Sequence, residues 1–129
     1  MQLFGPLTEG LGAALDLYQA RHQVLAENIA NSETPGYRAR ELQFADQLAA
    51  ALAPPEPGSK TPEGAKAPPE PPRIEPAVDR DAVLKPDGNS VALDVQVGRL
   101  SENVFKIQAL TQILSDRYAG LKRVIEGGK

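Results

Sequence analysis

The sequence predicts a mainly α fold in which a long N-terminal helix and a long C-terminal helix pair as an α-helical hairpin or coiled coil. Two runs, at residues 11–31 and 94–126, carry apolar residues at alternating spacings of three and four. The stretch between them is rich in Pro and leaves too little chain for a large β domain. We expect three regions: an N-terminal helical region at 1–52, a disordered Pro-rich flexible linker at 53–85, and a turn with the long C-terminal helix at 86–129.

The C-terminal run is predicted to form one long helix with a narrow apolar stripe. A period of about 3.5 residues keeps such positions on one side of a helix, as in the contact line of a coiled coil. At about 1.5 Å per residue this helix would be about 50 Å long. Asp94 is its candidate N-cap. The predicted C-terminal seam consists of Val97, Leu100, Val104, Ile107, Leu114, Tyr118, Leu121 and Ile125, with Thr111 in the missing place, and is widened by Phe105, Leu110, Ile113 and Val124.

The N-terminal run predicts a second helix with the same heptad pattern. Thr8 is a plausible N-cap, but Gly10 and Gly12 weaken that start, so the firm helix is expected from Leu11 to about Asn31. Residues 1–52 carry three Arg and six acids, whereas residues 91–129 carry six Lys or Arg and four acids. This opposite charge modestly favours pairing of the two helices. The predicted N-terminal seam consists of Leu11, Leu15, Tyr18, Leu25 and Ile29, with His22 at the remaining position.

A strong turn signal, Ser-Glu-Thr-Pro-Gly-Tyr at 32–37, follows the first helix. Pro35 has the fixed φ of a turn's second position, and Gly36 can take the positive φ that the third position of a type II turn requires. After the turn, an amphipathic pattern predicts a short middle helix from about Glu41 to Leu52. Pro-Asp-Gly at 86–88 marks another turn, before a short extended segment to about Leu93.

Residues 54–76 have the composition of a spacer. Nine of these 23 residues are Pro, and the others are mainly Glu, Lys, Gly, Ala and Ser. Such a segment cannot form a regular hydrogen-bond ladder and has too little apolar surface to offset its ordering entropy. We interpret it as a mobile linker rich in polyproline II, in preference to a docking motif for a proline-binding module.

Composition and motifs argue against catalysis and against most ligands. The chain has no Cys, and His22 is its single histidine, so one chain cannot supply a His pair for a metal. A Ser-His-Asp set would have to use His22, which lies on the seam, and no phosphate-binding glycine loop is present. The net charge of −3 disfavours nucleic acid. These residues predict a binding or building protein without cofactor or small-molecule substrate.

Two further segments bear on location. No stretch approaches the roughly 20 consecutive apolar residues of a membrane span. The N-terminal ten residues lack both a basic lead and an apolar core, so no cleaved secretion signal is expected.

The stretch AENIANSETPGYRARELQFADQL resembles the N-terminal signature of the flagellar basal-body rod and axial protein family. The residues that match the family motif are Asn28, Asn31, Thr34, Pro35, Gly36 and Tyr37. DGNSVALD at 87–94, followed by the helix with KIQALTQILSDRYAGLKRVI, is similar to the family's C-terminus. The resemblance covers about residues 10–52 and 85–126, and its short form is closest to the proximal rod members. Gln96 and Val97 depart from the acidic residue and Met expected there.

This resemblance implies a structural subunit of the bacterial flagellar rod, which transmits torque towards the hook. It further implies export from the cytoplasm by the flagellar type III export apparatus without a cleaved signal, and location in the periplasmic rod. The implied partners are other rod proteins, the membrane-ring adaptor and further copies of the chain, bound through the terminal helices. The alternatives are the other short proximal rod protein of the family, a cytoplasmic coiled-coil adaptor, and a small enzyme.

Overall fold

The computed structural model describes residues 5–52 and 75–128. Most of the predicted linker lies outside the described residues. Five elements follow along the chain: α1 (Pro6–Ala30), β1 (Arg40–Glu41), α2 (Phe44–Leu52), β2 (Ala77–Val78) and α3 (Leu93–Gly127). The fold is mainly α, as predicted.

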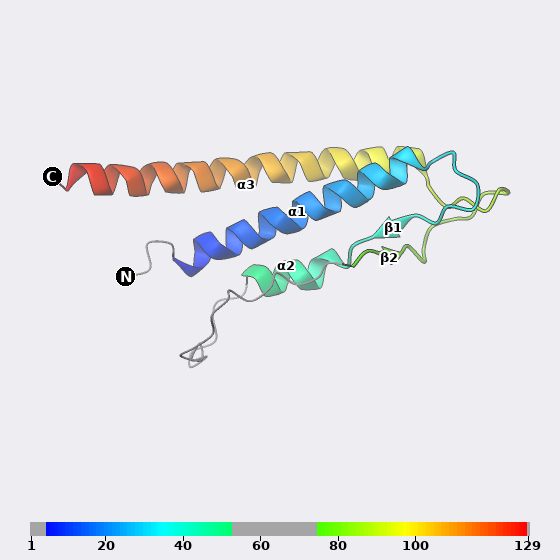
Figure 1. The fold of residues 1–129 in the computed structure, drawn as a ribbon, viewed down its shortest axis with the longest axis horizontal. Coiled ribbons are helices and arrows are strands. Elements are labelled where there is room, and N and C mark those ends of the chain that lie inside the picture. Colours follow the sequence, from blue (N-terminus) through cyan, green and yellow to red (C-terminus); the bar gives the residue numbers. More distant parts are fainter. Residues whose placement is uncertain (1–4, 53–74, 129) are drawn as a thin grey trace.

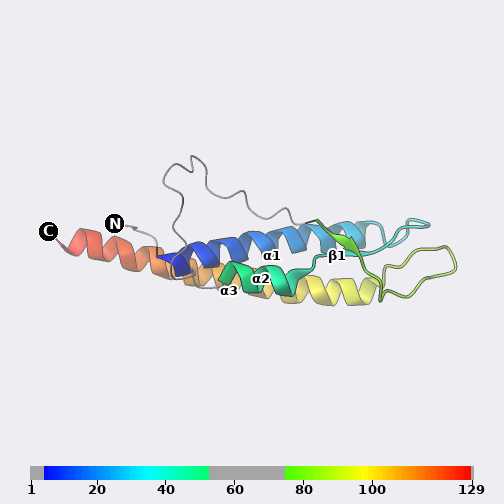
Figure 2. The same cartoon turned by 90° about the horizontal axis from the view of Figure 1, so that it is seen from below.

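The two long helices lie side by side and antiparallel, and they form the predicted helical hairpin (Figure 1). The middle helix α2 folds back against α1, and Figure 2 shows the three helices together from a second direction. The strands pair antiparallel near the loop end of the hairpin, with Arg40 opposite Val78 and Glu41 opposite Ala77. At the other end, α3 continues well past the start of α1 (Figure 1).

Three predicted helix starts are wrong. Helix α1 begins at Pro6 with Gly5 as N-cap, because proline has the helical φ and its missing N–H is not needed at the first position. Thr8 is therefore buried within the first turn, with no cap hydrogen bond. Helix α3 begins after Ala92, so Asp94 lies in its first turn. Helix α2 begins three residues later than predicted because Arg40 and Glu41 pair with β2.

The predicted linker boundary at residue 85 also differs from the structure. Residues 77–78 form β2, and the Asp79 N–H donates to the Ala39 carbonyl at 2.9 Å. This pairing has no signal in the local sequence, because it depends on a partner strand almost forty residues earlier.

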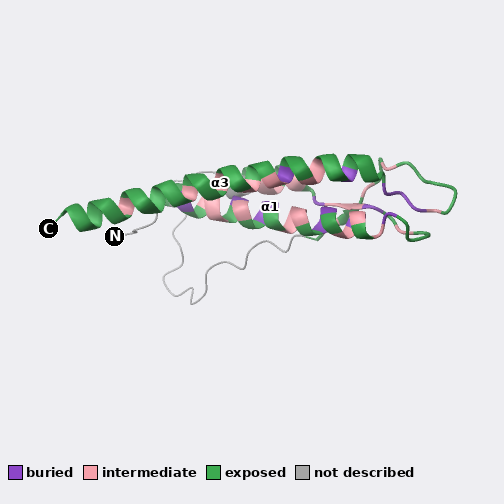
Figure 3. Cartoon of the chain, turned by 90° about the horizontal axis from the view of Figure 1, so that it is seen from above, coloured by how far each residue is buried: buried purple, intermediate pink, exposed green. Residues whose placement is uncertain are grey.

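The core is small, and its composition changes along the hairpin. Apolar residues are buried mainly on α1, whereas the buried polar residues, apart from Thr8, lie towards the loop end and on α3. Figure 3 shows buried residues along α1 and the loop end, and an α3 that is mostly exposed. Helix α3 has two buried residues, and both are amides, Gln96 and Asn103. The buried apolar set is Ala14, Leu17, Tyr18, Val24, Leu25, Ala39, Leu42 and Val91, and the buried polar set is Thr8, Asn28, Ser32, Asn89, Ser90, Gln96 and Asn103.

The predicted seams are only partly buried within this chain. On α1, Tyr18 and Leu25 are buried, while Leu11, Leu15 and Ile29 are partly buried. On α3, Val97, Tyr118 and Ile125 are exposed within this chain, because the helix turns its amides towards α1 and extends beyond the start of α1. The partly buried seam residues of α3 are Leu100, Val104, Ile107, Leu114 and Leu121.

Candidate functional site: a polar interlock and an uncovered helix face

Asn28 joins three parts of the chain near the loop end. Its side chain is fully buried near the end of α1. The Nδ2 group donates to the Arg40 carbonyl at 2.7 Å and to Gln96 Oε1 at 3.1 Å. Its Oδ1 accepts from the Arg40 N–H at 3.0 Å and from the Tyr37 hydroxyl at 3.3 Å. One amide therefore connects α1 to β1, to the turn and to α3.

The two predicted turns lie against each other. The Tyr37 N–H donates to the Thr34 carbonyl at 3.2 Å, which closes the predicted turn, and Gly36 has a φ of 73°. The Gly36 N–H in turn donates to the Asp87 carbonyl at 3.0 Å. Gly88 has a φ of 80°, and a Cβ added there would lie 3.5 Å from the Gly36 Cα. That distance is an ordinary contact, so the positive φ is what favours glycine at both positions.

Asn89 and Ser90 fasten the second turn to the first. Asn89 is fully buried, and its Nδ2 donates to the carbonyls of Asn31 and Thr34 at 2.9 and 2.7 Å. The Ser90 N–H donates to the Tyr37 carbonyl at 3.0 Å, and Ser90 Oγ accepts from the Ala39 N–H at 2.8 Å. We call residues 28–40 and 85–96, joined by these bonds, the polar interlock.

The Tyr37 phenol of the polar interlock has a shifted pKa. Burial raises its pKa above the ordinary value of 10.0, because the phenolate would be poorly solvated; the Arg40 charge opposes this. The neutral hydroxyl is therefore the form that binds Asn28.

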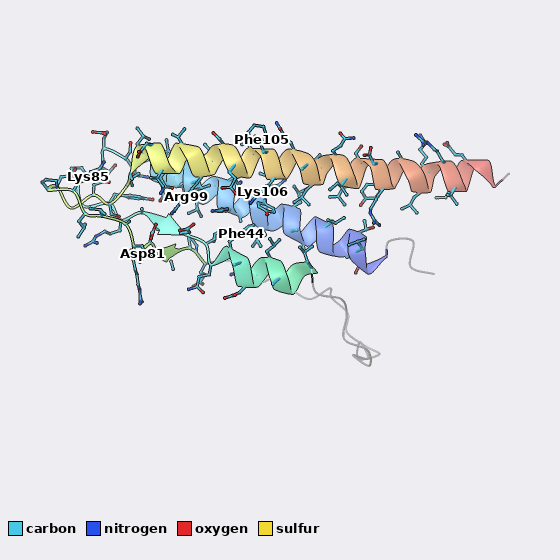
Figure 4. All side chains as sticks on the ribbon, turned by 180° about the vertical axis from the view of Figure 1, so that it is seen from behind. Phe44, Asp81, Lys85, Arg99, Phe105 and Lys106 are labelled. Atoms are coloured by element: carbon cyan, nitrogen blue, oxygen red, sulfur yellow. The ribbon has the colours of Figure 1, made fainter. Side chains whose placement is uncertain are left out.

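A cluster of charges holds the strand pair against the helices. The Arg99 guanidinium lies 3.0 Å from the Glu41 carboxylate and 3.5 Å from that of Asp79. Arg21 reaches the other Glu41 oxygen at 3.5 Å, and its guanidinium lies 5.0 Å from the centre of the Phe44 ring. Figure 4 shows Arg99 on the side of α3 that faces the strands. The Glu41 and Asp79 carboxylates therefore both form ion pairs, which is the role of a structural group.

The outer side of α3 exposes large apolar side chains. Phe105 is 71% exposed, and Figure 4 shows it on the side of α3 away from α1. Towards the C-terminus, where α3 extends beyond the start of α1, Val124 and Ile125 are 74% and 61% exposed. Ile113, between these positions, is also exposed. Ile125 lies on the seam side of the helix and is exposed because α1 does not extend that far. We call Phe105 and Val124, with Ile113 at the edge of the groove along α1 and α2, the outer apolar face.

Within residues 5–52 and 75–128, no group of three or more His, Cys, Asp or Glu side chains could hold a metal ion. No helix in the same part of the chain is long and apolar enough to cross a membrane. His22 is partly buried on α1, and its Nδ1 has no hydrogen-bond partner among the described residues.

Comparison with known proteins identifies the family. The chain is 30% identical over 126 residues to a protein of Salmonella typhimurium named flagellar basal body rod protein FlgB, with 89% of each chain covered. A protein of the same name from Cereibacter sphaeroides is 34% identical over 120 residues, which cover 88% of this chain and 89% of the relative. The chain belongs to the FlgB family. The Bacillus subtilis FlgB protein aligns over the full length of both chains at 26% identity. No protein-family model matches the chain.

Membership of the FlgB family makes this chain a structural subunit of the flagellar basal-body rod, located in the basal body and assembled with other basal-body components. The comparisons give no support to the adaptor or to the other short rod protein. The FlgB-type motif residues converge at the loop end: Asn28, Asn31, Thr34, Gly36 and Tyr37 all make interlock hydrogen bonds, and Pro35 is exposed within the turn.

The sequence analysis missed several residues that join the helices, turns and strands. Asn89 and Ser90 lie in the segment that carried the resemblance, and Asn89 follows an Asp-Gly turn, which is a usable signal. Gln96, Asn103 and Arg99 had no signal, because polar residues on a helix are expected to face water.

Proposed function

We propose that this rod subunit assembles through its terminal helices and transmits torque mechanically along the proximal rod. The observation that carries the proposal is the outer apolar face of α3, whose large side chains are 46% to 74% exposed in the described part of the chain. Apolar surface of this kind usually marks an interaction site. The N-terminal and C-terminal seams, partly buried in the hairpin, would contribute the inner contacts of the same helices.

The proposed partners are neighbouring copies, other rod proteins and the membrane-ring adaptor. The chain would reach the periplasmic rod through the flagellar export apparatus, without a cleaved signal peptide. We propose no catalytic role and no small-molecule or nucleic-acid ligand. Residues 53–74 would act as a spacer between the two helical regions, because loop length costs little free energy.

Val124→Asp tests the assembly role. Val124 is 74% exposed, so its replacement changes few contacts within the chain, but it places a carboxylate on the outer apolar face. We expect the variant to be exported, to be absent from purified basal bodies and to abolish swimming, since a carboxylate buried without a partner is strongly unfavourable. Ser115→Asp is the matched control: it makes the same charge change at an exposed polar position of the same helix, and should swim normally. Normal rods with Val124→Asp would contradict the proposal.

A further inference from the structure

Each buried amide of α3 is followed directly by a valine. Gln96 is 3% exposed and Asn103 is fully buried, whereas Val97 is 46% exposed and Val104 is only partly buried. Successive residues of an α-helix are about 100° apart, so a rotation of α3 by that angle would exchange both amides for both valines. Apolar burial alone favours the valines. Something other than apolar burial therefore sets the rotation of α3.

Hydrogen bonds to α1 explain the observed orientation. Gln96 Oε1 accepts from Asn28 Nδ2 at 3.1 Å, and Asn103 Nδ2 donates to the Tyr18 carbonyl at 2.9 Å. The two amides are seven residues apart, so they act on the same side of α3 two turns from each other. In the rotated helix neither amide could reach α1, and Asn28 would lose one of its four bonds.

Asn103 also carries a cost, which argues against a role in stability alone. Its Oδ1 is buried and has no hydrogen-bond partner among the described residues. A buried polar group that costs stability but excludes competing arrangements is one device by which helix pairs specify register.

We propose that Gln96 and Asn103 are rotation keys, which select the observed orientation of α3 over a rival orientation with Val97 and Val104 turned inwards. The keys determine which side chains of α3 face outwards. In the observed orientation Val97 joins Leu93, Val95 and Phe105 among the exposed apolar residues. The inference goes beyond the proposed function, because it concerns how α3 packs on α1 within one chain. It does not depend on which partner binds the exposed side of α3.

Thiol labelling tests the keys, because the chain has no native cysteine. Val97→Cys reports the outward valine position, Leu110→Cys reports the side that faces α1, and Glu102→Cys reports a side exposed in both orientations. Each reporter is labelled in the otherwise native chain and in the Gln96→Ala/Asn103→Ala chain. Without the keys we expect labelling at position 97 to slow by at least about tenfold, since a buried thiol reacts only through local opening. Labelling at 110 should become faster and labelling at 102 should stay unchanged.

Two results would overturn the proposal. Unchanged rates at 97 and 110 would mean that the remaining bonds of the polar interlock, and not Gln96 and Asn103, set the rotation. Faster labelling at all three positions, with helicity retained in circular dichroism, would mean that the amides only stabilise the pair. If the double variant does not fold, Asn103→Ala alone, which keeps the Asn28–Gln96 bond, should still slow labelling at 97, and its failure to do so would count against the keys.

Discussion

Replacing Asn28 by alanine should be among the most damaging single substitutions in the hairpin. The change removes four hydrogen bonds and leaves the Arg40 N–H, the Arg40 carbonyl and Gln96 Oε1 without their partner. An unsatisfied buried polar group costs about 1–3 kcal/mol. Arg40 is partly accessible to water, so its N–H and its carbonyl should each cost about 1 kcal/mol, the lower limit of this range. Gln96 is buried, so its Oε1 should cost about 2 kcal/mol, the middle of the range. The free energy of unfolding should then fall by about 4 kcal/mol, a large share of the roughly 5–15 kcal/mol of a typical domain.

Urea unfolding followed by circular dichroism measures this loss. With a slope of about 2 kcal/mol per molar urea, the midpoint should fall by about 2 M. Gln23→Ala is the control: it removes an amide five residues earlier on α1 whose bond to Glu27 is exposed, and should cost less than about 0.5 kcal/mol. Asn28→Asp should cost no less than Asn28→Ala, because it keeps the acceptor for the Arg40 N–H but loses both donors and buries a carboxylate oxygen against the Arg40 carbonyl. A loss below about 1 kcal/mol for Asn28→Ala would refute the view that Asn28 organises the loop end.

Three other perturbations give separate tests. Gly36→Val should destabilise the chain by at least about 1 kcal/mol in the same urea assay, because its φ is positive, whereas Gly36→Asn should be better tolerated. The raised pKa of Tyr37 should make stability fall as pH rises above 10.0 through the folded-state pKa, and Tyr37→Phe should remove that component; an identical pH profile for both chains would speak against it. Deleting residues 58–67 should leave swimming in soft agar nearly unchanged, and loss of swimming with export intact would point to a contact instead of a spacer.

The fold class and both turns followed from local patterns. The three-and-four spacing marked both long helices, and Pro35-Gly36 marked the turn whose positive φ the structure shows. Such features depend on residues that are close together in the chain, so local propensity and periodicity can predict them. The family motif also pointed to the loop end, where its residues meet.

Other features depended on contacts between distant residues. Local preference placed Val97 and Val104 inside and gave no strand at 77–78, yet the structure turns Gln96 and Asn103 inwards and pairs β2 with β1. The amide contacts join residues 68 and 85 positions apart, and the Arg99 ion pair with Glu41 spans 58. The sequence by itself determined which stretches form helices and where the turns lie, because those depend on neighbouring residues. Only the tertiary structure decided which side of α3 faces α1, because a buried amide is favourable only when a distant partner accepts or donates its hydrogen bond.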